Sequence, residues 1–259
     1  MSHFSLAVIS PETADIDEIM EPFYEGIDME PYVAKTKRQL IKSAREYYQA
    51  RYEDCLKKEA EIMEDDKDYL PNLKRITQMT DDELYDFERE RYDPENFDKE
   101  GNLISTYNPK SKYDWYEIGG RWHNLLELKE KDKDGNSIKV NQAKIKDVNF
   151  ESNLEAYNDA IAFWENYVEG KDPASVGFVL YRPEYYLNKY KTKESFAKSS
   201  STFTTFAVIT PDGEWHEEGE MMMFGISINE DDEWNTNYKE RFLDCADEDF
   251  MITIIDCHI

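Results

Sequence analysis

The sequence predicts an α+β fold with a central, mostly antiparallel sheet that contains both terminal strands. Three observations favour it: apolar runs at residues 3–9 and 251–259, amphipathic helical stretches between them, and a last third in which turns separate short apolar runs. Strands grouped apart from helices are typical of α+β domains. We expect one domain over residues 1–259, with helical insertions at about 33–100 and 150–198 packed on the sheet.

The first third predicts one strand and then helical structure. Residues 3–9 form a short apolar run ended by Ser-Pro, which is typical of a buried strand. Residues 12–32 are acidic and interrupted by proline and glycine, so they predict an irregular excursion. Over residues 33–64, apolar side chains recur at spacings of three and four, which predicts a helix. Thr36 and Gln39 are spaced for a capping box at its start.

The middle third alternates helix and strand signals. Residues 80–91 begin with Thr-Asp-Asp-Glu and predict a second helix. Residues 103–107 predict a strand. A Lys-Asp-Gly-Asn turn predicts a hairpin between strands at 125–129 and 137–140. Residues 150–169 place aromatic and aliphatic side chains on one helical face.

The last third is mainly β. A short strand at residues 177–181 precedes a helix within residues 185–201, whose serine-rich end predicts a mobile connection. The remaining elements follow the same hydrophobic patterns: strands at 202–209, 214–217 and 221–228, a helix at 232–244, and a final strand at 251–259.

Composition limits the classes of function. The 57 acidic residues exceed the 31 basic ones and give a formal net charge of −26. Such a charge works against direct binding to nucleic acid or to an anionic membrane, and attracts basic protein surfaces. The three cysteines form no C-x-x-C pair, and the sequence shows no signal peptide or membrane span. We therefore expect a protein of a reducing cytoplasm.

The densest cluster of chemically distinctive side chains lies at residues 106–126, where aromatics alternate with cations around two glycines. Glycine allows positive φ or close approach to a ligand, and the Asn-Pro pair in this stretch predicts a turn. Aromatic faces, cations and bare backbone together suit a flat anionic ligand. We predict a pocket for a small nucleotide-like anion, lined by Asn108, Lys110, Lys112, Trp115, Tyr116, Gly119, Gly120, Arg121 and Trp122.

Within this predicted pocket, Trp115 and Trp122 would stack on a base, while Lys112 and Arg121 would hold the anion. The block contains neither a P-loop nor a dinucleotide-binding glycine pattern. It fits a packed bend equally well, with both tryptophans anchoring the core and the cations paired with carboxylates.

A second candidate set, for a metal ion, comprises His216, Glu220, Asp256 and His258. Strand alternation places Asp256 and His258 on one face and Cys257 on the other, which excludes a Cys257–His258 dyad. His3 joins the set if the terminal strands are neighbours. Imidazoles with carboxylates suit a transition metal or acid–base chemistry, but the same groups also fit satisfied polar residues at strand ends.

Acidic runs form a third candidate feature, at residues 61–68, 81–90 and 230–233. Closely spaced carboxylates on a helix face can imitate the phosphate array of DNA. Ordinary solvated faces give the same pattern, so the sequence leaves both interpretations open.

Blocks of sequence from end to end of the chain resemble one known family. They are Met1-Ser-His-Phe4, the stretch from Tyr107 to Trp122, Thr205-Phe-Ala-Val208, Gly213-Glu-Trp215, Gly219-Glu-Met221 and the closing Asp256-Cys-His-Ile259. Together they resemble an uncharacterised family of proteins encoded by bacteriophages and prophages. Family members have Trp where this chain has Tyr113, and Gly-Trp-Trp where it has Met222-Met-Phe224. The resemblance implies a viral or prophage origin and a bacterial cytosol, and carries no assigned activity.

Three functions remain open on the sequence. The leading hypothesis is a phage-type cytoplasmic accessory protein, acting against host defence, that binds a small nucleotide-like anion through residues 107–123. The alternatives are an acidic inhibitor or DNA mimic that occupies a basic groove of a host enzyme, and a metal-assisted hydrolase. The expected partner is a nucleotide-like molecule or a basic host protein, and an apolar terminal strand at a sheet edge would also pair with a second copy.

Overall fold

The computed structural model describes residues 2–57, 69–221 and 227–259. Contacts divide the chain, predicted as a single domain, into two compact units. The first comprises Met1–Glu25 and Lys110–Ile259, and the second comprises Gly26–Pro109. The helices expected at about 33–100 therefore belong to a unit with a core of its own, whereas those expected at 150–198 belong to the unit that holds the sheet.

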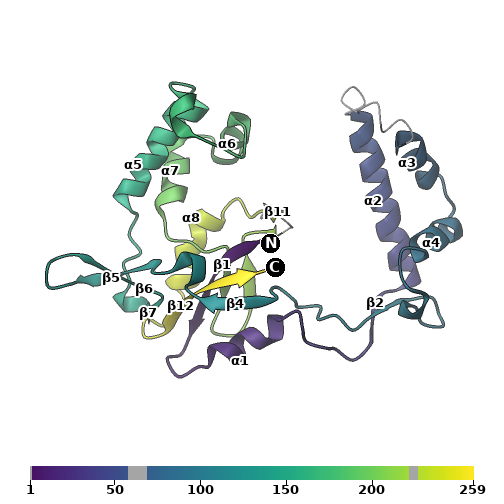
Figure 1. The fold of residues 1–259 in the computed structure, drawn as a ribbon, viewed down its shortest axis with the longest axis horizontal. Coiled ribbons are helices and arrows are strands. Elements are labelled where there is room, and N and C mark those ends of the chain that lie inside the picture. The colour runs from purple at the N-terminus through teal and green to yellow at the C-terminus, as the bar shows by residue number, and fades with distance from the viewer. Residues whose placement is uncertain (1, 58–68, 222–226) are drawn as a thin grey trace. The chain divides into compact units, whose positions relative to one another are not determined.

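The first unit is built on a mixed, mostly antiparallel sheet that contains both terminal strands, which confirms the predicted fold class (Figure 1). The strand order is β4 (Trp115–Ile118), β12 (Met251–His258), β1 (His3–Ser10), β8 (Ala207–Ile209) and β9 (Trp215–Glu217). β1 runs antiparallel to β12, from His3 opposite His258 to Ser10 opposite Met251, and parallel to β8. β7 (Gln142–Lys144) pairs with β12 beside β4.

The final strand is central in this sheet and does not form an edge. β12 lies between β1 on one side and β4 with β7 on the other. Its last seven residues are buried, as are the last seven of β1, because both faces of the sheet are covered. The premise for pairing with a second copy through the terminal strand is therefore wrong.

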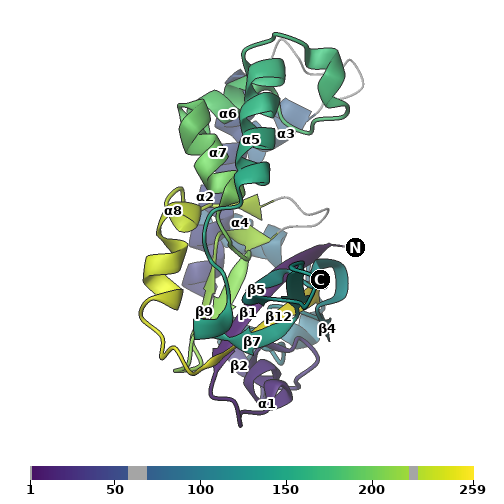
Figure 2. The same cartoon turned by 90° about the vertical axis from the view of Figure 1, so that its left-hand side faces the viewer.

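Helices cover both faces of the sheet (Figure 2). On one face, α8 (Trp234–Tyr238) and the π-helical turn η9 (Lys239–Leu243) pack on Ala7 and Ile254. On the other face, α1 (Ile16–Met20) and η1 (Glu21–Phe23) pack on Leu6 and Ile255. The helix predicted at 232–244 is confirmed, whereas the stretch predicted as irregular at 12–32 contains α1, which Asp15 caps through its side chain.

The remaining elements of the first unit include the predicted hairpin, formed by β5 (Leu126–Lys131) and β6 (Ser137–Val140). The other two-stranded pair is β10 (Glu220–Met221) with β11 (Ser227–Ile228); the rest of the strand predicted at 221–228 lies outside the described residues. The helical elements are η4 (Gly120–Trp122), η5 (Ile145–Asp147), α5 (Leu154–Phe163), η6 (Trp164–Val168), η7 (Pro173–Val176), α6 (Pro183–Tyr190) and α7 (Lys193–Ser201).

Four predictions in this unit are wrong in detail. Residues 177–181 form no strand, and the Phe178 side chain there is 92% exposed. The helix predicted within 185–201 is two helices, because Lys191 adopts a positive φ of 65° between them. The serines predicted as a mobile connection are the last turn of α7, where Ser201 is buried. The strand predicted at 202–209 begins only at Ala207.

The second unit contains α2 (Lys37–Lys57), α3 (Tyr69–Thr77), α4 (Asp81–Arg89), η3 (Pro94–Asn96) and the strand pair β2 (Tyr32–Lys35) and β3 (Leu103–Ser105). The Gln39 side chain accepts from the Thr36 amide at 2.9 Å, and the Gln39 amide donates to Thr36, which confirms the predicted capping box. Residues 58–64 of the helix predicted at 33–64 lie outside the described residues.

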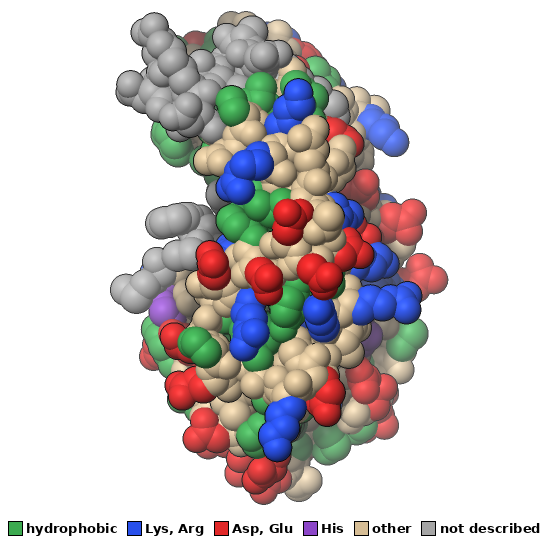
Figure 3. Space-filling model, turned by 90° about the vertical axis from the view of Figure 1, so that its right-hand side faces the viewer, with side chains coloured by type: hydrophobic (Ala, Val, Ile, Leu, Met, Phe, Trp, Pro, Cys, Tyr) green, Lys and Arg blue, Asp and Glu red, His purple; other side chains and the backbone are tan. Residues whose placement is uncertain are grey.

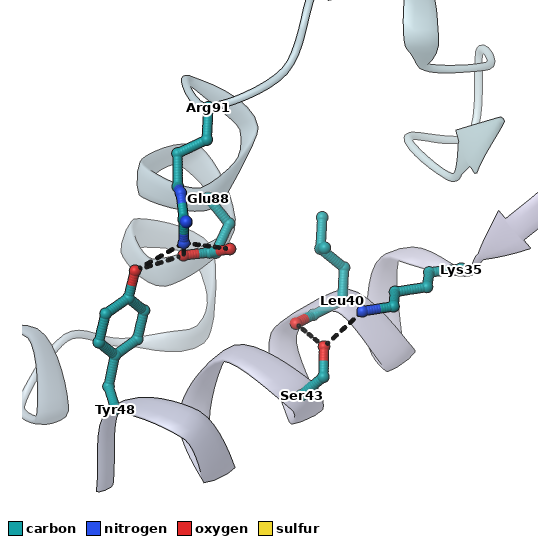
Figure 4. A network of polar contacts seen from close by, with 6 residues as sticks. All are labelled: Lys35, Leu40, Ser43, Tyr48, Glu88 and Arg91. Atoms are coloured by element: carbon teal, nitrogen blue, oxygen red, sulfur yellow. Dashed lines mark hydrogen bonds and ion pairs between the residues drawn. The ribbon is translucent and has the colours of Figure 1, made fainter. Parts of the chain in front are cut away.

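A buried polar network ties α2 to α4 in the second unit (Figure 4). The Tyr48 hydroxyl donates to the Glu88 carboxylate at 2.9 Å, and Arg91 reaches the same carboxylate at 3.1 Å. Glu88 is only 5% exposed, so its charge needs both partners.

Across the described parts of both units, no helix has the length and apolarity needed to cross a membrane.

Candidate ligand site around the Gly119–Gly120 turn

The two glycines of the central block form a turn that a residue with a Cβ would strain. Gly119 has φ +80° and Gly120 has φ +45°, so both adopt the positive φ that was predicted. A Cβ on Gly120 would lie 2.4 Å from Asp256 Cβ, and one on Gly119 would lie 2.4 Å from the Asn141 amide nitrogen. The close approach that glycine permits is therefore to two protein side chains.

Asp256 is the buried carboxylate against which this turn packs. Its Oδ2 accepts a hydrogen bond from the Arg121 amide at 2.9 Å, and its Oδ1 accepts from the His3 ring nitrogen Nδ1 at 2.8 Å. Asp256 is 2% exposed. The desolvated charge is thus satisfied by one backbone donor and one imidazole, in agreement with the expectation that His3 joins the terminal strand.

His258 forms a second imidazole–carboxylate pair next to the first. Its Nδ1 lies 2.5 Å from Asp114 Oδ1, and its ring stacks on Trp115 with centroids 5.2 Å apart. The rings of His3 and His258 have centroids 4.9 Å apart. The Nε2 atom of His258 is buried, and nothing in the described part of the chain hydrogen-bonds to it.

A hollow of about 610 Å³ lies beside the turn, which contributes Arg121, Trp122 and His123 to its lining. The Asn141 side chain donates to the His123 ring at 3.1 Å and so orients that ring. The other lining groups include amides and hydroxyls as well as apolar side chains, among them Lys139, Asn149, Asn153, Leu154, Thr202 and Phe203.

Arg121 and Lys139 have no hydrogen-bonded or ion-paired side-chain partner among residues 2–57, 69–221 and 227–259. By contrast, Lys112, predicted to hold the anion, pairs with Glu217 at 2.7 Å. Glu127 also lines the hollow, but hydrogen bonds from Lys131 and then Ser137 hold it and lower its pKa. The cationic charge available to a ligand thus comes from Arg121 and Lys139.

The other residues predicted for the pocket have varied environments. Trp115 is 44% exposed, so its indole is partly available to a ligand. The Tyr116 hydroxyl donates to Asp17, and burial, followed by that hydrogen bond, raises the pKa of Tyr116. Asn108 is buried and belongs to the second unit, whereas Lys110 begins the long segment of the first.

The four residues predicted as metal ligands are not brought together. β1 and β8 separate His216 on β9 from His258 on β12, and His216 packs against the Phe242 ring. Glu220 accepts a hydrogen bond from Asn229. Where the chain is described, no three His, Cys, Asp or Glu side chains form a group suited to a metal ion.

The exclusion of a Cys257–His258 dyad is confirmed. Cys257 lies in the core on the opposite face of the sheet from His258, and burial raises the pKa of its thiol well above the ordinary value. Of the residues that shape the site, Asp114 and Lys139 were missing from the predicted sets. Asp114 had a local signal, since it stands beside Trp115 in the central block, whereas Lys139 had none.

Three of the six sequence blocks that carry the resemblance meet at this end of the sheet. The opening block supplies His3, the central block supplies Asp114 and Arg121, and the closing block supplies Asp256 and His258. Comparison with protein-family models, with curated proteins and with solved structures finds no match for this chain. Function is therefore inferred from the geometry of the site.

Proposed function

We propose that this chain is a phage-type accessory protein that binds a small anionic, nucleotide-like ligand in the hollow beside the Gly119–Gly120 turn. One observation carries the proposal: Arg121 and Lys139, whose side chains make no hydrogen bond or close ion pair with a described residue, line the same hollow in a chain of net charge −26. Action against host defence is part of the proposal through the sequence resemblance alone.

The chemistry of the hollow suits such a ligand. A guanidinium binds phosphate oxygens in bidentate fashion, and an ammonium adds a second positive charge. Trp122 and His123 offer ring surface for a base, while the asparagine and hydroxyl groups of the lining offer donors and acceptors. At about 610 Å³ the hollow falls within the range usual for small-molecule sites, roughly 300–1,000 Å³.

The first test is native mass spectrometry of gently purified protein, followed by calorimetric titration with a panel of mono-, di- and cyclic dinucleotides. Arg121→Ala and Lys139→Ala should each weaken binding about tenfold or more, because a hydrogen bond to a charged group contributes roughly 1.5–3 kcal/mol. Lys133→Ala is the matched control, since Lys133 is an exposed cation of the β5–β6 turn outside the hollow. Binding that both hollow variants retain would refute the proposal, as would a panel in which nothing binds.

The acidic-inhibitor alternative has less support in the described residues. In the predicted run 81–90, Asp81 pairs with Arg45 at 2.6 Å and Glu88 with Arg91. In the run 230–233, Asp231 pairs with Arg241 at 2.7 Å, and the run 61–68 lies outside the described residues. On the face shown in Figure 3, acidic and basic side chains lie beside one another and form no continuous acidic surface.

A further inference from the structure

The paired histidines of β1 and β12 form a group that the hollow does not use. His3 donates from Nδ1 to Asp256, and His258 donates from Nδ1 to Asp114. A carboxylate at Nδ1 fixes the ring orientation and leaves Nε2 as the nitrogen available for chemistry. Two imidazoles, each held by its own carboxylate, therefore meet edge to face, with centroids 4.9 Å apart and an interplanar angle of 76°.

The second observation is a polar atom without a partner. The His258 side chain is 6% exposed, and its Nε2 is buried with no hydrogen bond to any described residue. An unsatisfied buried polar group costs roughly 1–3 kcal/mol, so each one in a folded chain calls for an explanation, and a catalytic role is one such explanation. His3 is also largely buried, with a side chain 9% exposed.

We propose that His3 and His258 are a general base and a general acid that cleave the phosphodiester of a small ribonucleotide. His3 Nε2 removes the proton from the 2′-hydroxyl, whose oxygen attacks phosphorus. The bond from phosphorus to the 5′-oxygen breaks, and that oxygen takes the proton from His258 Nε2. The products are a 2′,3′-cyclic phosphate and a nucleoside with a free 5′-hydroxyl, and exchange with water restores both rings.

Three features favour this reaction class. The nucleophile belongs to the substrate, so two oriented imidazoles supply all the proton transfers that it needs. His258 stacks on Trp115 at an interplanar angle of 18°, which holds its ring beside the partly exposed indole. The exposed part of Trp115 offers a stacking surface for a base, whereas the net charge of −26 disfavours a long polyanion.

Asp114 and Asp256 are positioning residues in this scheme, because each touches an imidazole and neither needs to touch the substrate. Asp256→Asn should therefore lower kcat and leave KM largely unchanged. The inference shares only the ligand class with the proposed function, since none of its four residues lines the hollow. Each can fail without the other.

The test is incubation of the full chain with the dinucleoside phosphates UpA and ApA, with product analysis by liquid chromatography and mass spectrometry. The expected products carry a 2′,3′-cyclic phosphate, and the 2′-deoxy analogues should remain intact. His3→Gln and His258→Gln should each lower the rate about 10²–10⁴-fold, the usual contribution of general acid–base catalysis. His216→Gln, purified in the same way, is the matched control and should retain the full rate.

Cleavage that survives in both glutamine variants would overturn the inference, as would absence of cyclic phosphate from both substrates with the unaltered chain. Thermal unfolding of each variant shows whether a loss of cleavage comes from loss of the catalytic ring or from loss of the folded structure. The two variants test this independently, because His3 and His258 lie on different strands. Calorimetric binding of the 2′-deoxy analogues separates the two proposals. Binding that depends on Arg121, without cleavage, would refute the proposed catalytic pair and support the proposed ligand site.

Discussion

Replacing Gly120 with alanine should destabilise the first unit more than the same change at Gly213. Both glycines have positive φ, +45° and +81°, where an alanine costs roughly 1–2 kcal/mol. A Cβ on Gly213 would meet nothing within 4 Å, whereas one on Gly120 would lie 2.4 Å from Asp256 Cβ. The buried Asp256 has to move, and this breaks the hydrogen bond that its carboxylate accepts from the Arg121 amide, at a cost of roughly 1.5–3 kcal/mol. The expected total for Gly120→Ala is about 2.5–5 kcal/mol.

Urea unfolding followed by tryptophan fluorescence measures this difference, with the free energy taken by linear extrapolation. All five tryptophans lie in the first unit, so the signal reports on the unit that holds the turn. Gly213→Ala supplies the backbone cost alone. Equal losses of stability in the two variants would show that contact between the turn and Asp256 carries no energetic weight, and would refute the reasoning.

Two further predictions follow from buried groups. Burial, and then the hydrogen bond with Glu88, raises the pKa of Tyr48 from 10.0 to about 12. This stabilisation is complete below pH 10 and is lost as the pH rises toward 12. The melting temperature measured by circular dichroism should therefore fall less steeply between pH 9 and 11 for Tyr48→Phe than for the unaltered chain. An equal fall in melting temperature for both proteins would contradict this prediction. In thiol labelling of folded protein, exposed Cys245 should react at once and buried Cys257 only after unfolding; early labelling of Cys257 would disprove its burial.

Sequence patterns predicted the structural elements whose interactions lie within a few residues of one another. The Thr36–Gln39 capping box was predictable because both partners lie within one helical turn. The terminal strands were predictable because apolar runs of that length are typical of strands buried on both faces. The run at residues 177–181 has a similar composition but pairs with no strand in the described part of the chain, which the sequence does not reveal because pairing is non-local. The break at Lys191 had no glycine to mark it.

The residues of the candidate site were likewise predictable only where they are close in the sequence. Trp115, the two glycines and Arg121 stood out because they are close in the sequence. The His258–Asp114 pair joins residues 144 positions apart, so no local pattern shows it. The predicted metal set depended on β9 approaching β12, whereas strand order places two strands between them.

The central position of β12 has a consequence for how the sheet is made during translation. His3 and Asp256, which share a hydrogen bond, are 253 positions apart. The ribosome therefore releases the apolar β1 long before its antiparallel neighbour exists, and during this interval one side of β1 is an open template for other chains. A nascent chain stopped before Met251 lacks the strand that joins β1 to β4 and β7. Premature termination should therefore yield aggregation-prone products, and shielding of β1 by a chaperone should raise the yield of native protein.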